Sequence, residues 1–439
     1  MPASETKDKL LIAFTNLGCK LNFAETSYLQ NKINKIEFTV VPFNSFADIY
    51  VINSCTVTET AEKKGRNVIS KAYHLNPNAK IIVIGCQSQI SPDAVSQLPG
   101  VTLVAGNAEK FDINNLLKKI HSVEPHKKIY VSTRDKISEF HSSVSFEGRT
   151  RCFIKVQDGC DYFCSYCIVP YARGKSRSDS VNNVISGIKE AEQRGVQEII
   201  LTGVNIGDFG KNTGESLYQL LKSIVSETSI PRIRISSVEP DLLNDEILDL
   251  VYGEARIMPH FHLPLQSGSD EILIAMRRRY NTGLFSDIVD KIRKKIPDAF
   301  IGVDVITGFP GESDLHYNET FDFLRHLDIS ALHVFPYSLR KGTKAAEIEE
   351  QIHSAIKTKR AKELLCLSDE KKATFYKRFR DKFCSVLVER ISKEGYAKGF
   401  SENYIPVEIK SDNSLLKNKI VKVKITDITE DFKMQGELI

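Results

Sequence analysis

The chain has 439 residues, of which 41% are hydrophobic and 26% charged, and its formal net charge is +4. This length predicts two or three domains, and the composition excludes a disordered or collagen-like protein. No apolar run reaches transmembrane length and the first residues are too polar for a signal peptide, so we expect a cytoplasmic protein with no membrane contact. In that compartment, the nine cysteines are expected to be metal ligands or core residues rather than disulfides.

The first segment alternates apolar strand patterns with helical patterns, which is typical of an α/β domain with a parallel sheet. Strands are predicted at 10–15, 49–53 and 81–85, and each is followed closely by a cysteine: Cys19, Cys55 and Cys86. Because functional groups collect beyond the carboxyl ends of parallel strands, the fold could bring these cysteines to one edge of the sheet. The alternative is that all three pack in the core as small hydrophobic residues.

After a polar stretch around 121–149, which is predicted to be a linker, the alternation of strands and helices resumes. Six strand-and-helix units over about 200 residues favour a partial or complete barrel over an open sheet. The predicted strands are 152–157, 198–203, 233–236, 261–265, 301–307 and 331–336.

The C-terminal part begins with a basic helix predicted at about 353–383, and the short alternating strands at 385–391, 405–410 and 419–426 indicate a small β-barrel. From Lys372 onward there are 14 basic and 10 acidic residues, so this part carries the whole net charge, 14 − 10 = +4. A basic patch at one end of the chain suits a polyanion such as RNA, although a solvated helix face would give the same count.

Cys160, Cys164 and Cys167 lie in one short stretch, Gly-Cys-Asp-Tyr-Phe-Cys-Ser-Tyr-Cys. Three cysteines at this spacing can bind three corners of a four-iron cluster and leave one iron open to a substrate or cofactor. A zinc loop is the alternative, but zinc sites usually pair two such units or add histidines. Cys152, Cys366 and Cys384 are instead expected to be core residues.

This stretch resembles the signature of radical S-adenosylmethionine enzymes, and its surroundings resemble their methylthiotransferase branch, in particular the MtaB type. The resemblance runs from about residue 10 to the C-terminus. Its motifs are Leu-Gly-Cys-Lys-Leu-Asn at 17–22, Asn-Ser-Cys-Thr-Val-Thr at 53–58, Gly-Cys-Gln at 85–87, Ile-Val-Pro-Tyr-Ala-Arg-Gly at 168–174, Leu-Thr-Gly-Val-Asn at 201–205, Ser-Ser-Val-Glu-Pro at 236–240, His-Leu-Pro-Leu-Gln-Ser-Gly at 262–268, Asp-Val-Ile-Thr-Gly-Phe-Pro-Gly-Glu at 304–312 and Gly-Phe-Ser-Glu-Asn-Tyr at 399–404.

The resemblance implies two [4Fe-4S] clusters, a radical one on Cys160, Cys164 and Cys167 and an auxiliary one on Cys19, Cys55 and Cys86. It further implies two S-adenosylmethionine molecules per turnover: one methylates sulfur at the auxiliary cluster and the other yields the radical. The implied substrate is N6-threonylcarbamoyladenosine at position 37 of the tRNA anticodon loop, which is converted to its 2-methylthio form. A reducing electron donor and a sulfur donor are implied as well, and the sequence identifies neither.

Further residues are expected to bind the cofactor or the RNA. The expected S-adenosylmethionine contacts are Gly203, Asn205, Glu239, Gln266 and Asp304, with helix caps and turns as the alternative. The expected RNA contacts are Arg378, Arg380 and Lys382 through phosphates and Phe400 and Tyr404 through base stacking, with barrel core as the alternative for both aromatics. Arg173, Lys175 and Arg177 could meet phosphates or cap a helix.

The expected fold is therefore an α/β protein with an N-terminal parallel-sheet domain, a central partial (β/α)6 barrel and a small C-terminal β-barrel of the OB-like TRAM type. The expected bounds are 8–125 for the first domain, 126–145 for a linker, 146–376 for the radical domain and 379–439 for the last. Within the same class, the rival substrates are isopentenyladenosine of tRNA and a ribosomal-protein aspartate. In a different class, the chain would be a non-catalytic iron–sulfur electron carrier or an RNA-binding module.

Overall fold

The computed structural model describes residues 9–121, 128–146, 150–429 and 431–439. These residues form two compact units. The first unit takes its described residues from Met1–Ser145, Asp158–Asp161 and Cys167–Arg177, and the second takes them from Phe146–Gln157, Tyr162–Tyr166 and Ser178–Ile439. The expected domain boundaries at 8 and at 125–126 lie outside the described residues.

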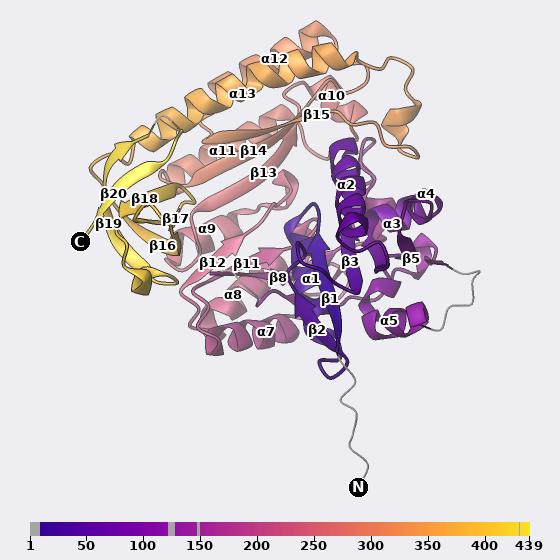
Figure 1. The fold of residues 1–439 in the computed structure, drawn as a ribbon. Helices are drawn as coiled ribbons and strands as arrows, with labels where there is room; N and C mark the ends of the chain where they lie inside the picture. The colour runs from indigo at the N-terminus through magenta and orange to yellow at the C-terminus, as the bar shows by residue number, and fades with distance from the viewer. Residues whose placement is uncertain (1–8, 122–127, 147–149, 430) are drawn as a thin grey trace. The chain divides into compact units, whose positions relative to one another are not determined.

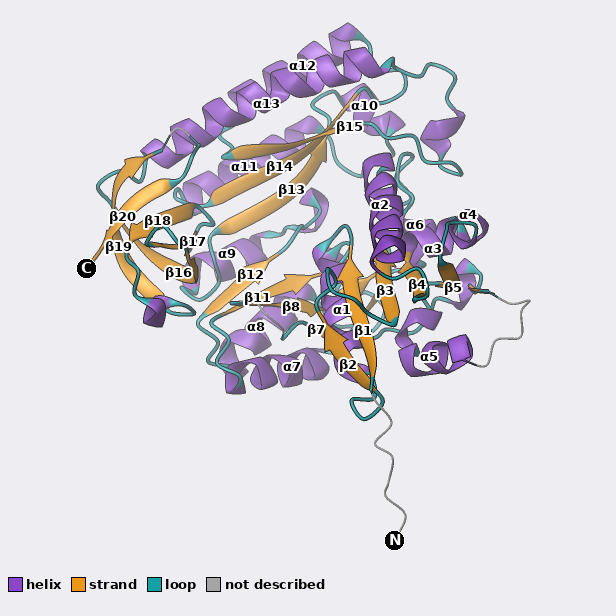
Figure 2. Cartoon of the chain, viewed as in Figure 1, coloured by secondary structure: helices purple, strands orange, loops and turns teal. Residues whose placement is uncertain are grey.

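The first unit is built on a six-stranded parallel sheet in the order β2-β1-β3-β4-β5-β6, with helices on both faces (Figures 1 and 2). The strands predicted from the sequence are β1, β3 and β4, and they lie next to one another in the sheet. The elements are β1 (Leu10–Asn16), α1 (Lys20–Lys32), β2 (Phe38–Val41), β3 (Ile49–Ser54), α2 (Glu59–Leu75), β4 (Lys80–Gly85), α3 (Cys86–Ile90), α4 (Pro92–Ser96), β5 (Val101–Ala105), α5 (Ile113–His121), β6 (Ile129–Tyr130), β7 (Ser143–Val144) and α6 (Val169–Arg173).

Both faces of this sheet are buried, which explains why its central strands are continuous apolar runs. In β3, Ile49 and Val51 belong to one core cluster, and Tyr50 and Ile52 belong to the other. Helices α1 and α5 contribute to the first cluster, and α2 and α4 contribute to the second. Strand β6 lies inside the range expected to be a linker, and it adds an edge strand to the sheet.

The second unit contains six strands that are each followed by helical segments, which confirms a partial barrel. Three of them form a parallel sheet in the order β12-β11-β8, and three form another in the order β13-β14-β15. A parallel bridge between Ser237 and His262 lies where β12 and β13 come together. The elements are β8 (Arg151–Lys155), β9 (Gln157–Asp158), β10 (Arg177–Ser178), α7 (Val181–Gln193), β11 (Glu198–Thr202), α8 (Leu217–Glu227), β12 (Arg232–Ile235), α9 (Asp245–Gly253), β13 (His260–Gln266), α10 (Asp270–Ala275), α11 (Thr282–Lys295), β14 (Phe300–Thr307), α12 (Asp314–His326) and β15 (Ala331–Pro336), of which β9 and β10 also contain a residue of the first unit.

The C-terminal part of the second unit is a closed barrel in the strand order β16-β17-β18-β20-β19, which confirms the expected small β-barrel. Its core includes Phe375 and Phe379, so the end of the preceding helix packs against the barrel. Buried and more exposed residues alternate along β17, β18 and most of β19, as a filled small barrel requires, whereas β16 buries three residues in succession. The elements are α13 (Ser354–Lys377), β16 (Phe383–Ile391), β17 (Tyr396–Ser401), β18 (Pro406–Lys410), β19 (Ile420–Ile428) and β20 (Met434–Leu438).

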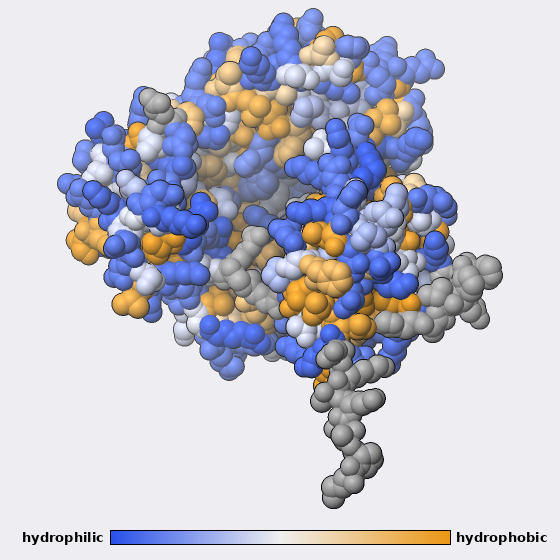
Figure 3. Space-filling view, in the orientation of Figure 1, coloured by the Kyte–Doolittle hydropathy of each residue, from blue (hydrophilic) through white to orange (hydrophobic). Residues whose placement is uncertain are grey.

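The surface of this C-terminal barrel is mostly hydrophilic on the face visible in Figure 3, with single apolar side chains between the polar ones. Phe383 and Leu415 are exposed at 59% and 78%. Scattered apolar residues of this kind are normal on a protein surface and do not by themselves mark an interface. Among the described helices, none is both long enough and apolar enough to cross a membrane.

Candidate functional sites

The three N-terminal cysteines lie at the carboxyl edge of three neighbouring strands of the first unit. Cys19 follows β1 and precedes α1, Cys55 follows β3, and Cys86 follows β4 as the first residue of α3. Cys55 and Cys86 are 5% and 6% exposed, while Cys19 is exposed to solvent. The fold therefore brings the three cysteines to one edge of the sheet, as the strand pattern made possible.

Gly18 permits the close approach of the Cys55 thiol to the backbone that precedes Cys19. Its φ is +88°, a conformation that favours glycine, and a Cβ at this position would lie 2.6 Å from Cys55 Sγ. The Cys55 thiol therefore packs directly against the backbone that precedes Cys19. Burial, followed by the nearby Cys86 thiol, raises the pKa of Cys55 to about 12, so a cation or a metal is needed to stabilise its thiolate.

The loop of the three central cysteines begins on a glycine that no other residue could replace without movement of the backbone. Gly159 has φ +71°, and a Cβ there would lie 2.0 Å from the carbonyl oxygen of Lys175. The next residue, Cys160, donates its backbone N–H to the carbonyl of Gly174 at 3.1 Å. This close backbone pairing fixes the start of the loop.

Cys164 is 8% exposed and lies beside an arginine of the second unit. The Nη1 atom of Arg278 is 2.9 Å from Cys164 Sγ and 3.4 Å from the hydroxyl of Tyr166. Its Nη2 atom forms an ion pair with Glu239. Burial raises the pKa of Glu239 to about 7 against the opposing effect of Arg278.

The end of β11 presents a buried amide with open hydrogen-bonding capacity. Asn205 is 3% exposed, and in the described part of the chain neither its Oδ1 nor its Nδ2 has a hydrogen-bond partner. Its backbone N–H donates to Gln157 Oε1 at 2.8 Å, and the N–H of Val204 donates to the same oxygen at 2.9 Å. Leaving such a group unpaired costs about 1–3 kcal/mol, so the amide is suited to bond a polar ligand.

Two histidines and an aspartate meet on the three strands β13, β14 and β15. His262 Nε2 lies 2.6 Å from Asp304 Oδ1, and one donor atom each of His262, Asp304 and His333 lie within 4.8 Å of one another. Gln266, at the end of β13, has φ +73°, an uncommon conformation for a residue other than glycine and one that clusters at functional sites. The predicted residues Gln266 and Asp304 thus both belong to the β13–β14 part of the sheet.

Comparison with known proteins covers almost the whole chain. Residues 154–324 match the radical SAM superfamily, and residues 11–106 match a family described as uncharacterized protein family UPF0004. The chain is 37% identical over 417 residues to the threonylcarbamoyladenosine tRNA methylthiotransferase MtaB of Aquifex aeolicus (strain VF5), with 94% of this chain and 100% of that protein covered. It is 35% identical to the MtaB of Bacillus subtilis (strain 168), with 94% and 93% covered.

This chain belongs to the MtaB-type methylthiotransferases of the radical SAM superfamily. A second group of relatives is also similar. The tRNA-2-methylthio-N(6)-dimethylallyladenosine synthase of Thermoanaerobacter pseudethanolicus (strain ATCC 33223 / 39E) is 32% identical over 449 residues, with 100% of this chain and 94% of that protein covered.

The fold also resembles solved structures. The radical S-adenosylmethionine methyltransferase TsrM from Kitasatospora setae matches at a TM-score of 0.58 and 15% identity, with 77% of each chain covered. The radical enzyme OxsB matches at a TM-score of 0.52 and 12% identity, with 82% of this chain and 57% of that one covered. At these identities the likeness concerns the fold alone.

The basic residues expected to contact RNA in this methylthiotransferase lie on the surface at the end of α13 and just after it. Each has an acidic neighbour. Arg378 lies 2.7 Å from Asp328, Arg380 lies 3.9 Å from Asp427, and Lys382 lies 3.6 Å from Asp298. Exposed pairs of this kind contribute little to stability and can exchange their partner for a phosphate.

The two aromatics expected to stack on bases are in contact within the second unit. The rings of Phe400 and Tyr404 stack on each other with centroids 4.8 Å apart. The guanidinium of Arg151 lies 4.8 Å from the Phe400 ring and donates from Nη1 to the Tyr404 hydroxyl at 3.0 Å. Arg234 lies over the other ring at 4.7 Å. Both rings therefore contact the β8 and β12 side of the second unit, and base stacking by them stays a prediction.

The expectation that the three remaining cysteines are core residues is confirmed for two of them. Cys152 and Cys384 are buried, but Cys366 is exposed, so that expectation was wrong for Cys366. The apolar run around it spans more than one face of α13: Leu364 and Leu367 face the core, and Leu365 is 48% exposed. A helix cannot bury four consecutive residues against one neighbour.

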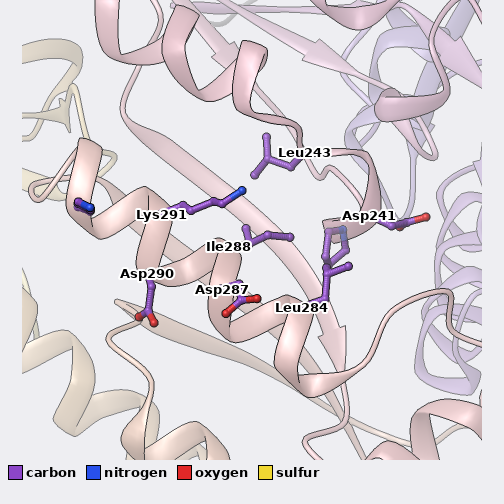
Figure 4. Close-up of a pocket in the computed structure, with 9 residues that line it drawn as sticks. Asp241, Leu243, Leu284, Asp287, Ile288, Asp290 and Lys291 are labelled. Carbon is purple, nitrogen blue, oxygen red and sulfur yellow. The ribbon is translucent and has the colours of Figure 1, made fainter.

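A groove in the second unit holds none of the predicted residues. It has a volume of about 570 Å³. Figure 4 shows the α11 side chains Asp287, Ile288 and Lys291 on one side and Asp241 and Leu243 on the other. Its mixed charges leave no concentration of one sign for a ligand, so we assign the groove no role.

Proposed function

We propose that this methylthiotransferase converts N6-threonylcarbamoyladenosine at position 37 of tRNA to its 2-methylthio derivative, and that its partner is the anticodon loop. The observation that carries the proposal is the similarity to relatives named for that activity over 94% of this chain. The three thiols gathered beyond β1, β3 and β4 support it, because they supply a second ligand set besides the central loop.

We propose that Cys160, Cys164 and Cys167 hold one [4Fe-4S] cluster and that the three N-terminal cysteines hold a second. The residues fit such groups: each set offers three thiols, and Arg278 beside Cys164 supplies an N–H donor of the kind that stabilises cluster sulfur. When bound, the first cluster supplies the electron that cleaves one S-adenosylmethionine, and the second cluster and the other S-adenosylmethionine supply the sulfur and the methyl group for transfer. The donors of the electrons and of the sulfur are not identified.

The polar residues around β11 and β13 would bind S-adenosylmethionine. Asn205 offers both an acceptor and a donor to a polar edge of the ligand, and Gln157 holds the backbone on which Asn205 stands. At Gly203 a Cβ would lie 2.8 Å from Gln157 Oε1, so only glycine keeps this turn tight. Glu239 would bond an amino or hydroxyl group, and Gln266 and Asp304 would complete the site.

We further propose that residues 379–439 form a TRAM domain that binds the RNA. The proposed contacts are Arg380, Lys382, Phe400 and Tyr404 in this domain and Arg378 just before it. The other proposed domain ranges are 8–125, a linker at 126–145, and 146–376. The site of action would be the cytoplasm. The closed barrel supports the RNA-binding proposal, since small barrels of this type present strand faces and loops to oligonucleotides.

Nucleoside mass spectrometry of tRNA from a strain that lacks this chain tests the substrate. We expect loss of the methylthio group from threonylcarbamoyladenosine alone, with recovery when the full-length chain is restored. Restoration of the Cys160→Ala or Cys55→Ala variant should fail to recover it. Loss of the methylthio group from dimethylallyladenosine instead would contradict the proposed substrate. A reconstituted chain that holds iron for one cluster and stays active after replacement of Cys19, Cys55 and Cys86 would overturn the second cluster.

A further inference from the structure

A buried arginine stands beside the N-terminal thiols of the first unit. Arg173 is the last residue of α6, and its side chain is 3% exposed. Its guanidinium donates hydrogen bonds to both carboxylate oxygens of Glu25 in α1, at 3.0 and 3.1 Å, and to Asn22 Oδ1 at 2.5 Å. A bidentate pair of this kind fixes both position and orientation. Arg173 thus holds the helix that begins directly after Cys19.

The same glutamate carries a second buried cation. Lys110 Nζ lies 2.6 Å from Glu25 Oε2 and 2.7 Å from Asn107 Oδ1, and the side chains of Lys110 and Glu25 are 1% and 0% exposed. The amide of Asn107 donates to the carbonyl of Ala172 at 2.7 Å and lies 3.7 Å from Cys86 Sγ. The network therefore extends from α1 to the thiol at the start of α3.

The network continues to the segment that precedes the central cysteine loop. Arg173 Nη1 lies 2.9 Å from Asp158 Oδ1, and Arg177 Nη2 lies 2.9 Å from Asp158 Oδ2. Asp158 also accepts from the N–H of Gly159 at 2.8 Å, next to Cys160 in the chain. One guanidinium therefore bonds both to the helix after Cys19 and to the residue two positions before Cys160.

The ion pairs described above bring three cations, those of Arg173, Lys110 and Arg177, to the carboxylates of Glu25 and Asp158. Buried cations are costly unless anions compensate them, and Asn107, which accepts from Lys110 at 2.7 Å, lies 3.7 Å from Cys86 Sγ. Three thiolates on a doubly positive four-iron core leave a single negative charge. The positive charges of Arg173 and Lys110 have the sign that stabilises such a group.

We propose that Arg173 is a positioning residue for the cluster on Cys19, Cys55 and Cys86: it orders the cysteine-bearing segments, and its charge, with that of Lys110, sets the reduction potential of that cluster. The inference rests on the proposed function, because it assumes that the second cluster exists. A positive charge close to a cluster favours its reduced, more negative state, so removal of the charge should lower the potential.

The test uses the full-length chain with Cys160, Cys164 and Cys167 replaced by alanine, so that only the second cluster is reconstituted. Arg173→Gln, Arg173→Lys and Lys110→Gln are made in this background. The control is Arg325→Gln, which breaks an exposed pair with Asp322. Iron and sulfide per chain are measured first, and the reduced cluster is then titrated against potential by electron paramagnetic resonance.

We expect Arg173→Gln to lower the ratio of reduced to oxidised cluster about tenfold at a fixed potential, which is about 59 mV for a one-electron couple. Lys110→Gln should shift it in the same direction by less, Arg173→Lys should lie between Arg173→Gln and the parent, and the control should not shift. If Arg173→Gln assembles no cluster, the reduction potential of the cluster in Lys110→Gln decides whether the buried charge sets the potential. An unchanged potential in the glutamine variants would overturn the inference, whereas a background chain without iron would overturn the second cluster itself.

Discussion

Arg278 donates a hydrogen bond from Nη1 to the sulfur of Cys164 at 2.9 Å while its other terminal nitrogen pairs with Glu239. The arginine side chain is 2% exposed, so water does not screen either interaction effectively. Because N–H donors to cluster sulfur favour the reduced state, this arginine is placed to make reduction easier for the cluster that we propose on Cys160, Cys164 and Cys167.

Replacement of Arg278 tests this arrangement. Loss of a hydrogen bond to a charged acceptor costs about 1.5–3 kcal/mol, so we expect Arg278→Gln to lower the rate of 5′-deoxyadenosine formation roughly ten- to hundredfold. Arg278→Lys keeps the charge and should retain more activity. Product release is followed by chromatography after reduction. Equal rates for the glutamine variant and the parent, at equal iron content, would contradict the expectation.

The raised pKa of Glu239 predicts a pH dependence of stability. Its folded pKa of about 7 lies above the ordinary value of 4.5, so the stabilising contribution of the protonated form is complete below pH 4.5 and is lost as the pH rises through 7. The loss is on the order of 3 kcal/mol. The urea midpoint of the apoprotein should therefore fall between pH 5 and 8 by less in Glu239→Gln than in the parent chain. Parallel pH profiles for the two proteins would be the contrary result.

The side-chain amide of Asn205 has no hydrogen-bond partner among the described residues. Its replacement should therefore weaken the binding of S-adenosylmethionine without lowering the stability of the fold. Asn205→Ala removes a buried polar group that has no partner among the described residues, so the free energy of unfolding should stay the same or rise. Binding of S-adenosylmethionine to the reconstituted enzyme should weaken about tenfold, as measured by calorimetry. The matched control is Asn182→Ala, at an exposed position of α7. Unchanged binding in Asn205→Ala would remove this residue from the ligand site.

Much of this architecture could be predicted from the sequence because the apolar strands are long and their ends carry unusual residues. β1, β3 and β4 were predicted within one or two residues, and Cys19, Cys55 and Cys86 follow from their ends. Other strands carry weaker patterns. Strand β6 has two residues, and β17 reads Tyr-Ala-Lys-Gly-Phe-Ser, so neither stands out from the surrounding loop.

The buried polar contacts could not be predicted in the same way, because they join residues far apart in the chain. Arg173 and Glu25 are separated by 148 positions, and Arg278 and Cys164 by 114. An arginine in a loop-like segment has the same local signal whether it meets a phosphate, caps a helix or pairs with a buried carboxylate. Only the fold decides among these, and it places Arg173 beside Glu25.

The proposed RNA contacts separate into two sets that salt dependence can distinguish. Arg380 and Lys382 are on the surface with acidic neighbours at 3.9 and 3.6 Å, and they are free to exchange these for phosphates. Tyr404 instead receives a hydrogen bond from Arg151 within the second unit. We expect Arg380→Gln and Lys382→Gln each to reduce the slope of log affinity for tRNA against log salt by about 1.

Tyr404→Phe should leave that slope unchanged and lower the free energy of unfolding by about 1 kcal/mol through the lost Arg151 bond. Filter binding at several salt concentrations and urea unfolding measure the two quantities on the same proteins. The matched control for charge is Lys344→Gln, an exposed residue paired with Glu347. A reduced slope in Tyr404→Phe, or an unchanged slope in Lys382→Gln, would reverse this division and place the RNA on the aromatic side of the barrel.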